Sequence, residues 1–387
     1  MAQVFGSFSS RTRFSPDIIA LYSQRMIQGA GISLFGIFLP IFLFEKLSFS
    51  LESVMVYYAI TWAAYLFAVQ PGARFMSKVG LKRSMIISSP FLVLFYIALY
   101  NVTTEDPWPW LGVSIAAATL WRMTYWVPYH TEFAQFTDRA NRGRQIGVLA
   151  SIAALIGVAT PIVAGFVIDS FGYQSLLVSA IILIVVSIFP LFLTRDVREK
   201  YSFGYWRTFA LLFTKHRRIL LAYGAEGAEV AIGLVIWPLF MYQIFEGNYF
   251  EIGAVSTLVI FATIVIRLLV GSYTDKFSKR RLLHWGTVIY ALGWIGKAFV
   301  QTGFQIFLAN TYHNLAQAVM RTPFDALTYE QMADSGHYVD EMSVFREISL
   351  NIGKVAMYIL LFVLVGLVSL NTTFWVAAFV ALFINVL

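Results

Sequence analysis

Long apolar runs alternate with short polar breaks along the whole chain of 387 residues. Each run is about 20 residues long, which is the length that a helix needs to cross the hydrocarbon core of a bilayer. The pattern therefore predicts twelve membrane-spanning helices. We expect them at 17–42, 51–72, 83–100, 110–136, 144–169, 173–194, 219–245, 250–271, 282–301, 304–330, 342–368 and 370–387.

Composition supports this interpretation, because 59% of the residues are hydrophobic and only 13% are charged. The expected fold class is an all-α polytopic membrane protein with no separate soluble domain. The absence of cysteine excludes disulfides, thiol catalysis and thiolate metal sites. Nothing at the N-terminus resembles a cleavable signal, whereas the last apolar run is short and lacks a basic tail, which suggests a trimmed C-terminus.

Basic residues are distributed unevenly between the two sides of the predicted bundle. Twenty lysines and arginines lie in the breaks on one side, and Lys46 alone lies in those on the other. Cytoplasmic loops carry such an excess, so we expect both termini in the cytoplasm and a location in the cell's inner (plasma) membrane. The net charge of +7 is thus explained by helix ends, and no nucleic-acid partner is expected.

An internal repeat divides the chain. The segment from Gln28 to Pro40 resembles the segment from Glu226 to Pro238. Gln28 pairs with Glu226 and Pro40 with Pro238, and each pair is 198 residues apart in the sequence. We expect two pseudo-symmetric six-helix bundles at 1–194 and 219–387. The basic and aromatic loop 195–218 between them is expected to hold an amphipathic helix on the inner membrane surface. Duplicated halves are typical of secondary transporters.

Two loops carry a family resemblance. The segment 271–281 resembles the G-x-L-A-D-R-x-G-R-[KR] signature of the major facilitator superfamily, and 72–83 is a second partial match after the second span. The resemblance implies twelve helices in two bundles and a cytoplasmic gate. Ser77 replaces the acidic residue of the signature, which puts an acid-based latch in the first half in doubt. The implied gate residues are Ser77, Lys78, Asp275, Lys276 and Arg280.

A weaker resemblance lies in the fifth span. The segment 157–165 is similar to the G-x-x-x-G-P-x-x-G-G pattern of exporters of that superfamily, with Thr160 and Ala164 in place of two glycines. It favours export slightly over uptake. Small residues at such spacing also occur in any tightly packed membrane helix, so the packing interpretation stays open.

Charged residues inside the predicted spans indicate function, because each costs roughly 2.5–3.5 kcal/mol to insert. Arg122 lies near the middle of the fourth span, with Trp126 and Tyr129 on the same helical face. A buried arginine stays charged and needs an anion, which is either a protein carboxylate or a substrate. By contrast, Arg267, Lys297, Arg346 and Glu347 lie near span ends, where they are expected to reach water.

The tenth span carries a polar stripe of Asn310, His313, Asn314, Gln317 and Arg321 on one helical face. In the superfamily, spans one, four, seven and ten line a central cavity. The resemblance therefore implies a substrate-binding cavity whose excess of basic groups favours an anionic or zwitterionic solute. Its expected residues are Arg25, Gln28, Arg122, Trp126, Tyr129, His313, Asn314, Gln317, Arg321 and Lys354.

Glu226 and Glu229 are the candidate proton-coupling residues. A carboxylate whose surroundings change as the halves rock can bind a proton on one side and release it on the other. A fixed bridge between a glutamate and an arginine of the other half is the alternative, and it stays open.

The leading hypothesis is a secondary transporter that moves a small organic or amphiphilic solute by alternating access, coupled to protons. A lipid flippase and a divalent-metal exporter are the nearest alternatives, the latter through His130, Glu132, His313 and Asp325. A ligand-binding membrane sensor and an integral-membrane enzyme are alternatives of other classes. We expect a monomer in the lipid bilayer without cofactor or resident metal.

Overall fold

The computed structural model describes residues 15–136, 142–196, 204–270, 278–334 and 339–387, and every regular element within them is a helix. The fold is an all-α polytopic membrane fold, as the apolar runs predict. Length and apolarity alone identify six of the described helices as able to cross a membrane, or seven when one bent pair is counted as a single span. The others are shorter or more polar.

The N-terminal half contains the first six spans. The bent pair α2 and α3, at an angle of 42°, forms the first span. Gly172 interrupts α7 with a φ of 77°, which side-chain-bearing residues rarely adopt, so α7 supplies both the fifth and the sixth span. The elements are α2 (Pro16–Gly36), α3 (Leu39–Lys46), α4 (Leu51–Val79), α5 (Leu81–Tyr100), α6 (Trp108–Phe136), α7 (Arg142–Val186) and η2 (Phe189–Leu193).

The C-terminal half contains the other six spans, and α8 precedes it. Each predicted span thus falls on a helix or part of one: α2 and α3 share the first span, α7 covers the fifth and sixth, and the short α14 and η4 form the last. The elements are α8 (Tyr205–Thr214), α9 (Arg217–Ile244), α10 (Tyr249–Val270), α11 (Lys279–Lys297), α12 (Gly303–Asp334), α13 (Val339–Val365), α14 (Leu370–Ala381) and η4 (Leu382–Val386).

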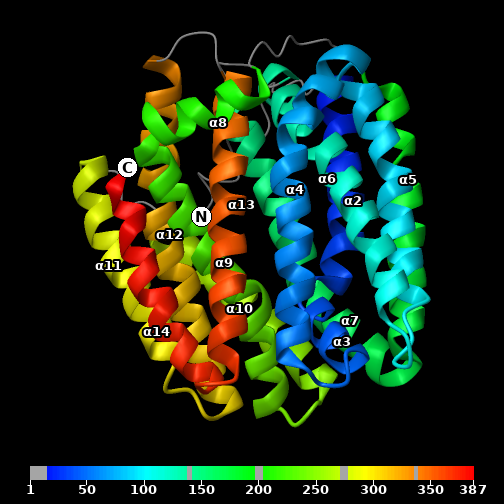
Figure 1. Ribbon diagram of the computed structural model, residues 1–387, viewed down its shortest axis with the longest axis vertical. Helices are drawn as coiled ribbons and strands as arrows, with labels where there is room; N and C mark the ends of the chain where they lie inside the picture. The colour runs from blue at the N-terminus through cyan, green and yellow to red at the C-terminus, as the bar shows by residue number, and fades with distance from the viewer. Residues whose placement is uncertain (1–14, 137–141, 197–203, 271–277, 335–338) are drawn as a thin grey trace, which may run out of the picture.

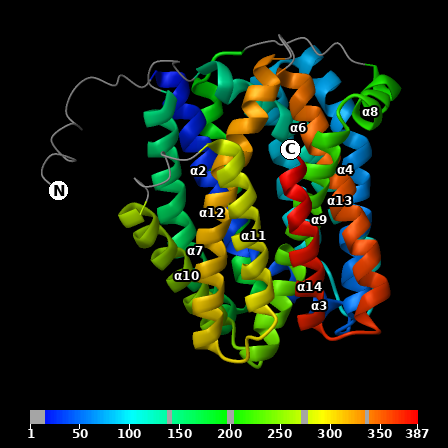
Figure 2. The same ribbon diagram turned by 90° about the vertical axis from the view of Figure 1, so that its left-hand side faces the viewer.

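The two halves stand side by side, and α4 of the first half packs against α13 of the second (Figure 1). A second such contact joins α7 to α10. The helix α8 lies across one end of the molecule, where α4 ends and α13 begins, as both views show (Figure 2). We call this the basic end, because it carries Arg74, Lys78 and Arg195, and we call the end that holds α3 the far end.

The contact between α7 and α10 is made backbone to backbone. A Cβ atom added to Gly253 would overlap the carbonyl of Pro161. The Thr257 hydroxyl donates to the Val158 carbonyl oxygen at 2.7 Å and accepts from the Ile162 amide at 3.2 Å, next to the proline. The Thr257 hydroxyl of α10 thus bridges a carbonyl and an amide of α7 that lie four residues apart, beside Pro161.

The far end holds further contacts between the halves. The Tyr249 hydroxyl of α10 donates to the Glu45 carboxylate of α3. The ring of Tyr249 also meets that of Tyr173 edge to face, at 5.5 Å between centroids. In addition, the Phe250 amide donates to the Asp169 carboxylate at 2.9 Å. These contacts tie the two halves together at the far end.

The fifth-span glycine pattern takes part in this packing. A Cβ atom on Gly165 would overlap the Tyr249 backbone, whereas one on Gly157 would meet open space. Gly165 therefore has a structural reason to lack a side chain, which favours the packing interpretation of the pattern.

Candidate functional site

Two cations from opposite halves share one aromatic ring. The Arg122 guanidinium carbon of α6 lies 4.5 Å from the Trp62 ring centroid of α4, and the Lys354 ammonium of α13 lies 3.5 Å from it. Such cation–π contacts stabilise a desolvated cation by about 2 kcal/mol. Within the described residues, the buried Nη1 atom of Arg122 has no hydrogen-bond partner. The guanidinium therefore has donor capacity left for an anion.

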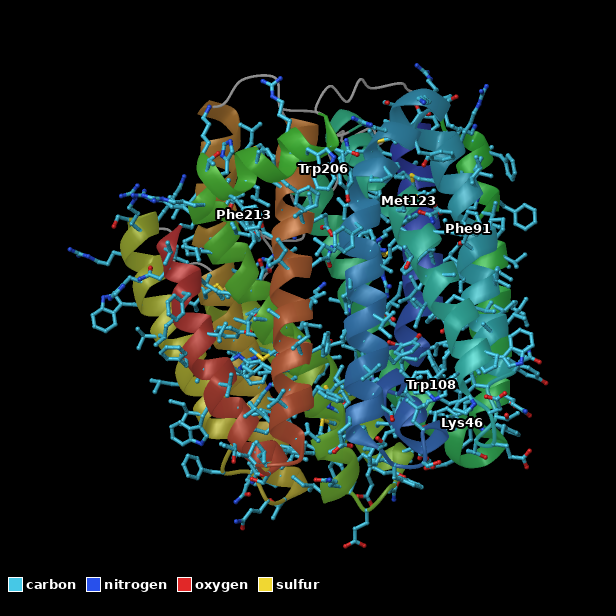
Figure 3. All side chains as sticks on the ribbon, viewed as in Figure 1. Lys46, Phe91, Trp108, Met123, Trp206 and Phe213 are labelled. Atoms are coloured by element: carbon cyan, nitrogen blue, oxygen red, sulfur yellow. The ribbon has the colours of Figure 1, made fainter. Side chains whose placement is uncertain are left out.

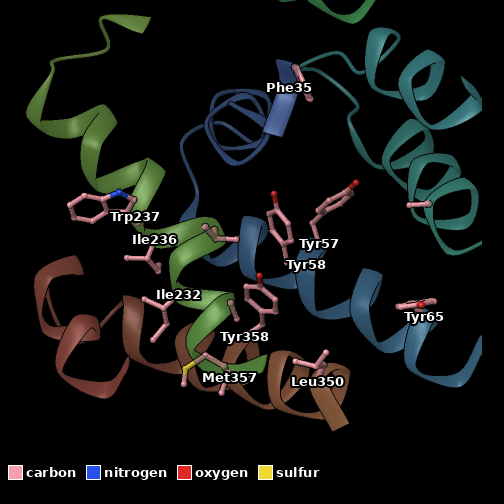
Figure 4. Packing of buried hydrophobic residues seen from close by; sticks show 14 of the residues in the cluster. Phe35, Tyr57, Tyr58, Tyr65, Ile232, Ile236, Trp237, Leu350, Met357 and Tyr358 are labelled. Carbon is pink, nitrogen blue, oxygen red and sulfur yellow. The ribbon is translucent and has the colours of Figure 1, made fainter. Parts of the chain in front are cut away.

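Tyrosines and one carboxylate surround this pair of cations along α4 and α13. The rings of Tyr58 and Tyr358 stack across the contact between the halves, with centroids 5.4 Å apart (Figure 4). Closer to the basic end, the Tyr65 hydroxyl donates to Glu347 at 3.4 Å, and Arg346 lies 3.8 Å from the same carboxylate. Arg346 and Glu347 thus pair with each other, and both side chains are half-buried.

The charges of this region do not cancel. Three cations, Arg122, Arg346 and Lys354, stand against the single carboxylate of Glu347 among the described residues. Uncompensated charge in a low-dielectric surrounding is costly. An anion bound near Trp62 would lower this cost, whereas a cation would raise it.

Arg25 and Gln28 of α2 lie in a separate aromatic surrounding. The Arg25 guanidinium carbon lies 4.9 Å from the Trp126 ring and 5.1 Å from the Tyr129 ring. Gln28 is fully buried, and neither polar atom of its side chain has a hydrogen-bond partner in the described part of the chain. The structure thus brings Arg25, Trp126 and Tyr129 together, and it leaves the Gln28 amide with unused hydrogen-bonding capacity.

In the C-terminal half, Glu226 of α9 is paired with an arginine. Nη1 of Arg321 on α12 donates to the Glu226 carboxylate, and Nε of the same arginine lies 3.1 Å from Asp325. Glu226 is buried, and its other oxygen has no partner among the described groups. The alternative of a bridge between the halves is not what the structure has at Glu226, because its arginine partner belongs to the same half.

Glu229 lies one turn further along α9 and faces α11. Its carboxylate accepts a hydrogen bond of 2.8 Å from Tyr290, whose hydroxyl oxygen lies 3.4 Å from the Gln317 amide nitrogen. The His313 ring lies between those of Tyr290 and Trp294, at 4.6 and 4.5 Å between centroids. Glu229 and His313 thus contact α11 inside the C-terminal half. A helical stripe does not specify which neighbour it faces: Glu229 and His313 contact rings of α11, whereas Arg122 contacts Trp62 of α4.

Lys297 is buried, so the prediction that it reaches water is wrong. Lys297 is only 2% exposed, and its ammonium lies 4.3 Å from the Trp237 ring centroid and 4.4 Å from the Trp294 ring centroid. The sequence places Lys297 near a helix end, but α9 continues past that level and covers it with Trp237. Arg267, in contrast, is exposed, and its Nη2 donates to the Asn314 backbone oxygen at 2.8 Å.

Three of the implied gate residues are described. The Ser77 hydroxyl donates to the Arg74 carbonyl of its own helix at 2.9 Å, while Lys78 and Arg280 are exposed. Asp275 and Lys276 lie outside the described residues. The first-half loop instead forms an ion pair between Arg83 and Asp196, at 3.1 Å.

Sequence reasoning missed the aromatic residues that hold the charges. Trp62, Tyr65 and Tyr290 lie within apolar runs that give no sign of a charged partner on another helix. For Lys297, Trp294 one turn earlier on the same helix was a usable signal, whereas Trp237 lies on α9. The metal-exporter residues also separate: Asp325 pairs with Arg321, His313 contacts rings, and the side chains of His130 and Glu132 lie outside the described set. The described residues include no cluster of three metal-ligating side chains.

These observations define the class of the protein: a multi-pass α-helical membrane protein of two six-helix bundles with buried charges in both. The sequence profile of the Major Facilitator Superfamily matches residues 21–225 and again 219–387. The chain therefore belongs to the Major Facilitator Superfamily, a family of secondary transporters. A comparison with curated proteins gives no significant match.

Proposed function

We propose that the protein transports a small organic or amphiphilic solute with an anionic or zwitterionic part, by alternating access and coupled to protons. The observation that carries the proposal is the pair of cations on Trp62. Arg122 comes from one half and Lys354 from the other, and the described charges around them leave an excess of positive charge. An anion bound there would contact both halves at once.

The aromatic surroundings favour a solute with an apolar body. Tyr58, Trp62 and Tyr358 offer ring faces next to the two cations. A charged group held by Arg122 and an apolar part against these rings would satisfy both features of the site. The same arrangement disfavours inorganic cations and metal ions.

Glu226 and Arg321 support the proton-coupling part of the proposal. Protonation of Glu226 would remove its attraction to Arg321 and leave the arginine with Asp325 alone. The packing of α9 against α12 would then change with the protonation state. Glu229 is the second proton-binding candidate, because Tyr290 holds it in a buried position on the same helix.

The contacts between Tyr249 and Glu45 favour a conformation that is closed at the far end. We place the basic end in the cytoplasm of a cell with the protein in its inner (plasma) membrane, in accord with the positive-inside rule. The solute would then enter and leave the present conformation from the cytoplasmic side. The fifth-span pattern adds only a slight preference for export, because packing against Tyr249 already accounts for Gly165.

A thermal-shift panel tests the solute class first. Purified protein is heated with organic anions, their neutral amides or esters, and amines of similar size. We expect an anion to raise the melting temperature and its neutral counterpart to leave it unchanged, because binding to the native state alone is stabilising. Stabilisation by amines or divalent metals, with none by anions, would contradict the proposal. The selected anion is then used for transport in proteoliposomes.

One observation favours a lipid flippase as a second candidate. A groove of about 470 Å³ with an almost entirely apolar lining lies between α9, α13 and α14. Its lining includes Leu220, Gly224, Met357, Leu360 and Phe383. Movement of a fluorescent phospholipid between leaflets of proteoliposomes, without movement of the selected anion, would favour this candidate.

A further inference from the structure

A pocket at the basic end lies apart from the buried charges. It has a volume of about 410 Å³ and is formed by the last turns of α4 together with α8. The Tyr205 hydroxyl of α8 contacts the Phe67 carbonyl of α4 at 3.5 Å, which joins the two walls. The lining residues are Gln70, Pro71, Arg74, Phe75, Lys78 and Tyr205.

Two cations of this pocket are available to a ligand. Arg74 and Lys78 are one helical turn apart, so they lie on the same face of α4. Both are exposed, and neither forms an ion pair with a described residue. The Ser77 hydroxyl between them is turned to a backbone carbonyl of its own helix. An anionic group with several oxygen atoms, such as a phosphate, would fit between the guanidinium and the ammonium.

An apolar track continues from the pocket along the same face of α4. Phe67 and Ile60 precede Arg74 by seven and fourteen residues, and their exposed fractions are 58% and 47%. Pro71, between Phe67 and Arg74, is exposed as well. The cations therefore lie at the end of a row of apolar side chains that runs towards the middle of the molecule. A free phosphate would contact the two cations only, whereas a phospholipid would contact the cations and the apolar row.

The helix α8 has the features of a helix that lies on a membrane surface. Thr208 and Leu212 are buried against the bundle, whereas Trp206 and Phe213 are 80% and 58% exposed. Figure 3 shows these two aromatic side chains on α8 at the basic end. Tryptophan and phenylalanine on such a helix are expected at the level of lipid head groups. The pocket under α8 would then open at that level.

We propose that this pocket binds an anionic phospholipid from the leaflet at the basic end. The phosphate lies between Arg74 and Lys78, beside Tyr205, and one acyl chain follows Pro71, Phe67 and Ile60. Basic pockets at the cytoplasmic ends of membrane helices suit such head groups. The bound lipid would connect α4 of the first half to α8, the helix that leads into the second half. This site is independent of the solute proposed above.

Lipid binding to the purified full chain in detergent tests the proposal. Native mass spectrometry compares phosphatidylglycerol with phosphatidylcholine of the same acyl chains, and glycerol phosphate serves as the head group alone. We expect the wild type to prefer phosphatidylglycerol by about tenfold or more. The Arg74→Gln/Lys78→Gln variant should lose this preference. Glycerol phosphate should not displace the lipid at equal concentration.

A matched variant separates the pocket from general surface charge. Arg280→Gln/Arg281→Gln removes two exposed cations on α11 instead, and it should keep the preference. Gel filtration and thermal unfolding show that each variant is folded. Equal affinity of the wild type for both lipids, a preference that survives loss of Arg74 and Lys78, or competition by glycerol phosphate would overturn the proposal.

A thiol placed in the pocket gives a second measurement. The chain has no cysteine, so Tyr205→Cys creates its only reactive site. Phosphatidylglycerol should slow its reaction with a maleimide several-fold, while phosphatidylcholine should not. A Phe213→Cys variant, on the exposed face of the same helix and outside the pocket lining, is the control and should react at the same rate with either lipid. Equal protection at both positions would contradict binding in the pocket.

Discussion

The two halves are built on one repeat but carry their charges in different ways. In the N-terminal half, Arg25 and Arg122 lie against aromatic rings. In the C-terminal half, Glu226 is paired with Arg321. The repeat makes the difference more precise, because an offset of 198 aligns Gln28 with Glu226, and the offset of 195 between Pro128 and Pro323 aligns Trp126 with Arg321.

The two halves of the repeat thus carry different residues at matching positions and can serve different functions. The C-terminal half has an ion pair between its first and fourth helices, formed by Glu226 and Arg321. The N-terminal half has the amide of Gln28 and the indole of Trp126 at the matching positions. A neutral pair does not respond to protons, whereas an ion pair does. We therefore propose that the N-terminal half together with Lys354 binds the anion and that the C-terminal half binds the proton.

The largest expected effect is the loss of anion binding in Arg122→Gln. Removing the guanidinium leaves the anion without its main partner in a dry site, which costs about 2 kcal/mol or more, or roughly 30-fold in affinity. Titration calorimetry with the anion selected by the thermal-shift panel measures the change. Lys46→Gln, which removes a cation at the far end, is the control. If Arg122→Gln binds the anion with wild-type affinity, the proposed anion site in the N-terminal half is wrong.

The next effect concerns a glycine pair at matching positions of the repeat. A Cβ atom on Gly227 would overlap the Leu350 carbonyl of α13, whereas one on Gly29 would meet open space. Gly227→Ala should therefore lower the free energy of unfolding by about 1–3 kcal/mol through overpacking. Gly29→Ala should stabilise the helix slightly or change nothing. Equal effects of the two variants in denaturant unfolding would contradict the close contact of α9 and α13.

The smallest effect is expected for Tyr290→Phe. This change removes the hydrogen bond to Glu229 and keeps the ring contact with His313. The loss should be about 1–2 kcal/mol of stability, because one hydrogen bond to a buried carboxyl group disappears. Tyr312→Phe, at a more exposed hydroxyl on α12 that donates to the Ile289 carbonyl, should cost less than Tyr290→Phe. Thermal unfolding that ranks the two variants in the opposite order would contradict a well-formed Glu229 contact.

The fold could be predicted from the sequence because a bilayer demands long apolar runs, and the polar breaks between the runs mark where the shorter or more polar spans begin and end. The bend between α2 and α3 and the positive φ of Gly172 could not be predicted. Both are features of backbone geometry inside apolar segments, where the hydropathy pattern shows no break. The site was accessible only in part. Charges inside spans identified Arg122, Glu226 and Lys354, but the choice of partner depends on which helix lies opposite. That is why Trp62 was missed, why Lys297 was expected to reach water, and why a bridge from Glu226 to the other half stayed open as an alternative.

The most direct test of the division between the halves compares exchange with proton-driven accumulation in Glu226→Gln. Proteoliposomes loaded with the selected anion report exchange when no gradient is present, and an imposed pH gradient reports accumulation. Our account predicts that Glu226→Gln exchanges the anion at a rate close to that of the wild type but no longer accumulates it. Accumulation at the wild-type level would contradict the role of Glu226 in proton binding, and loss of both activities would contradict the separation of the two tasks.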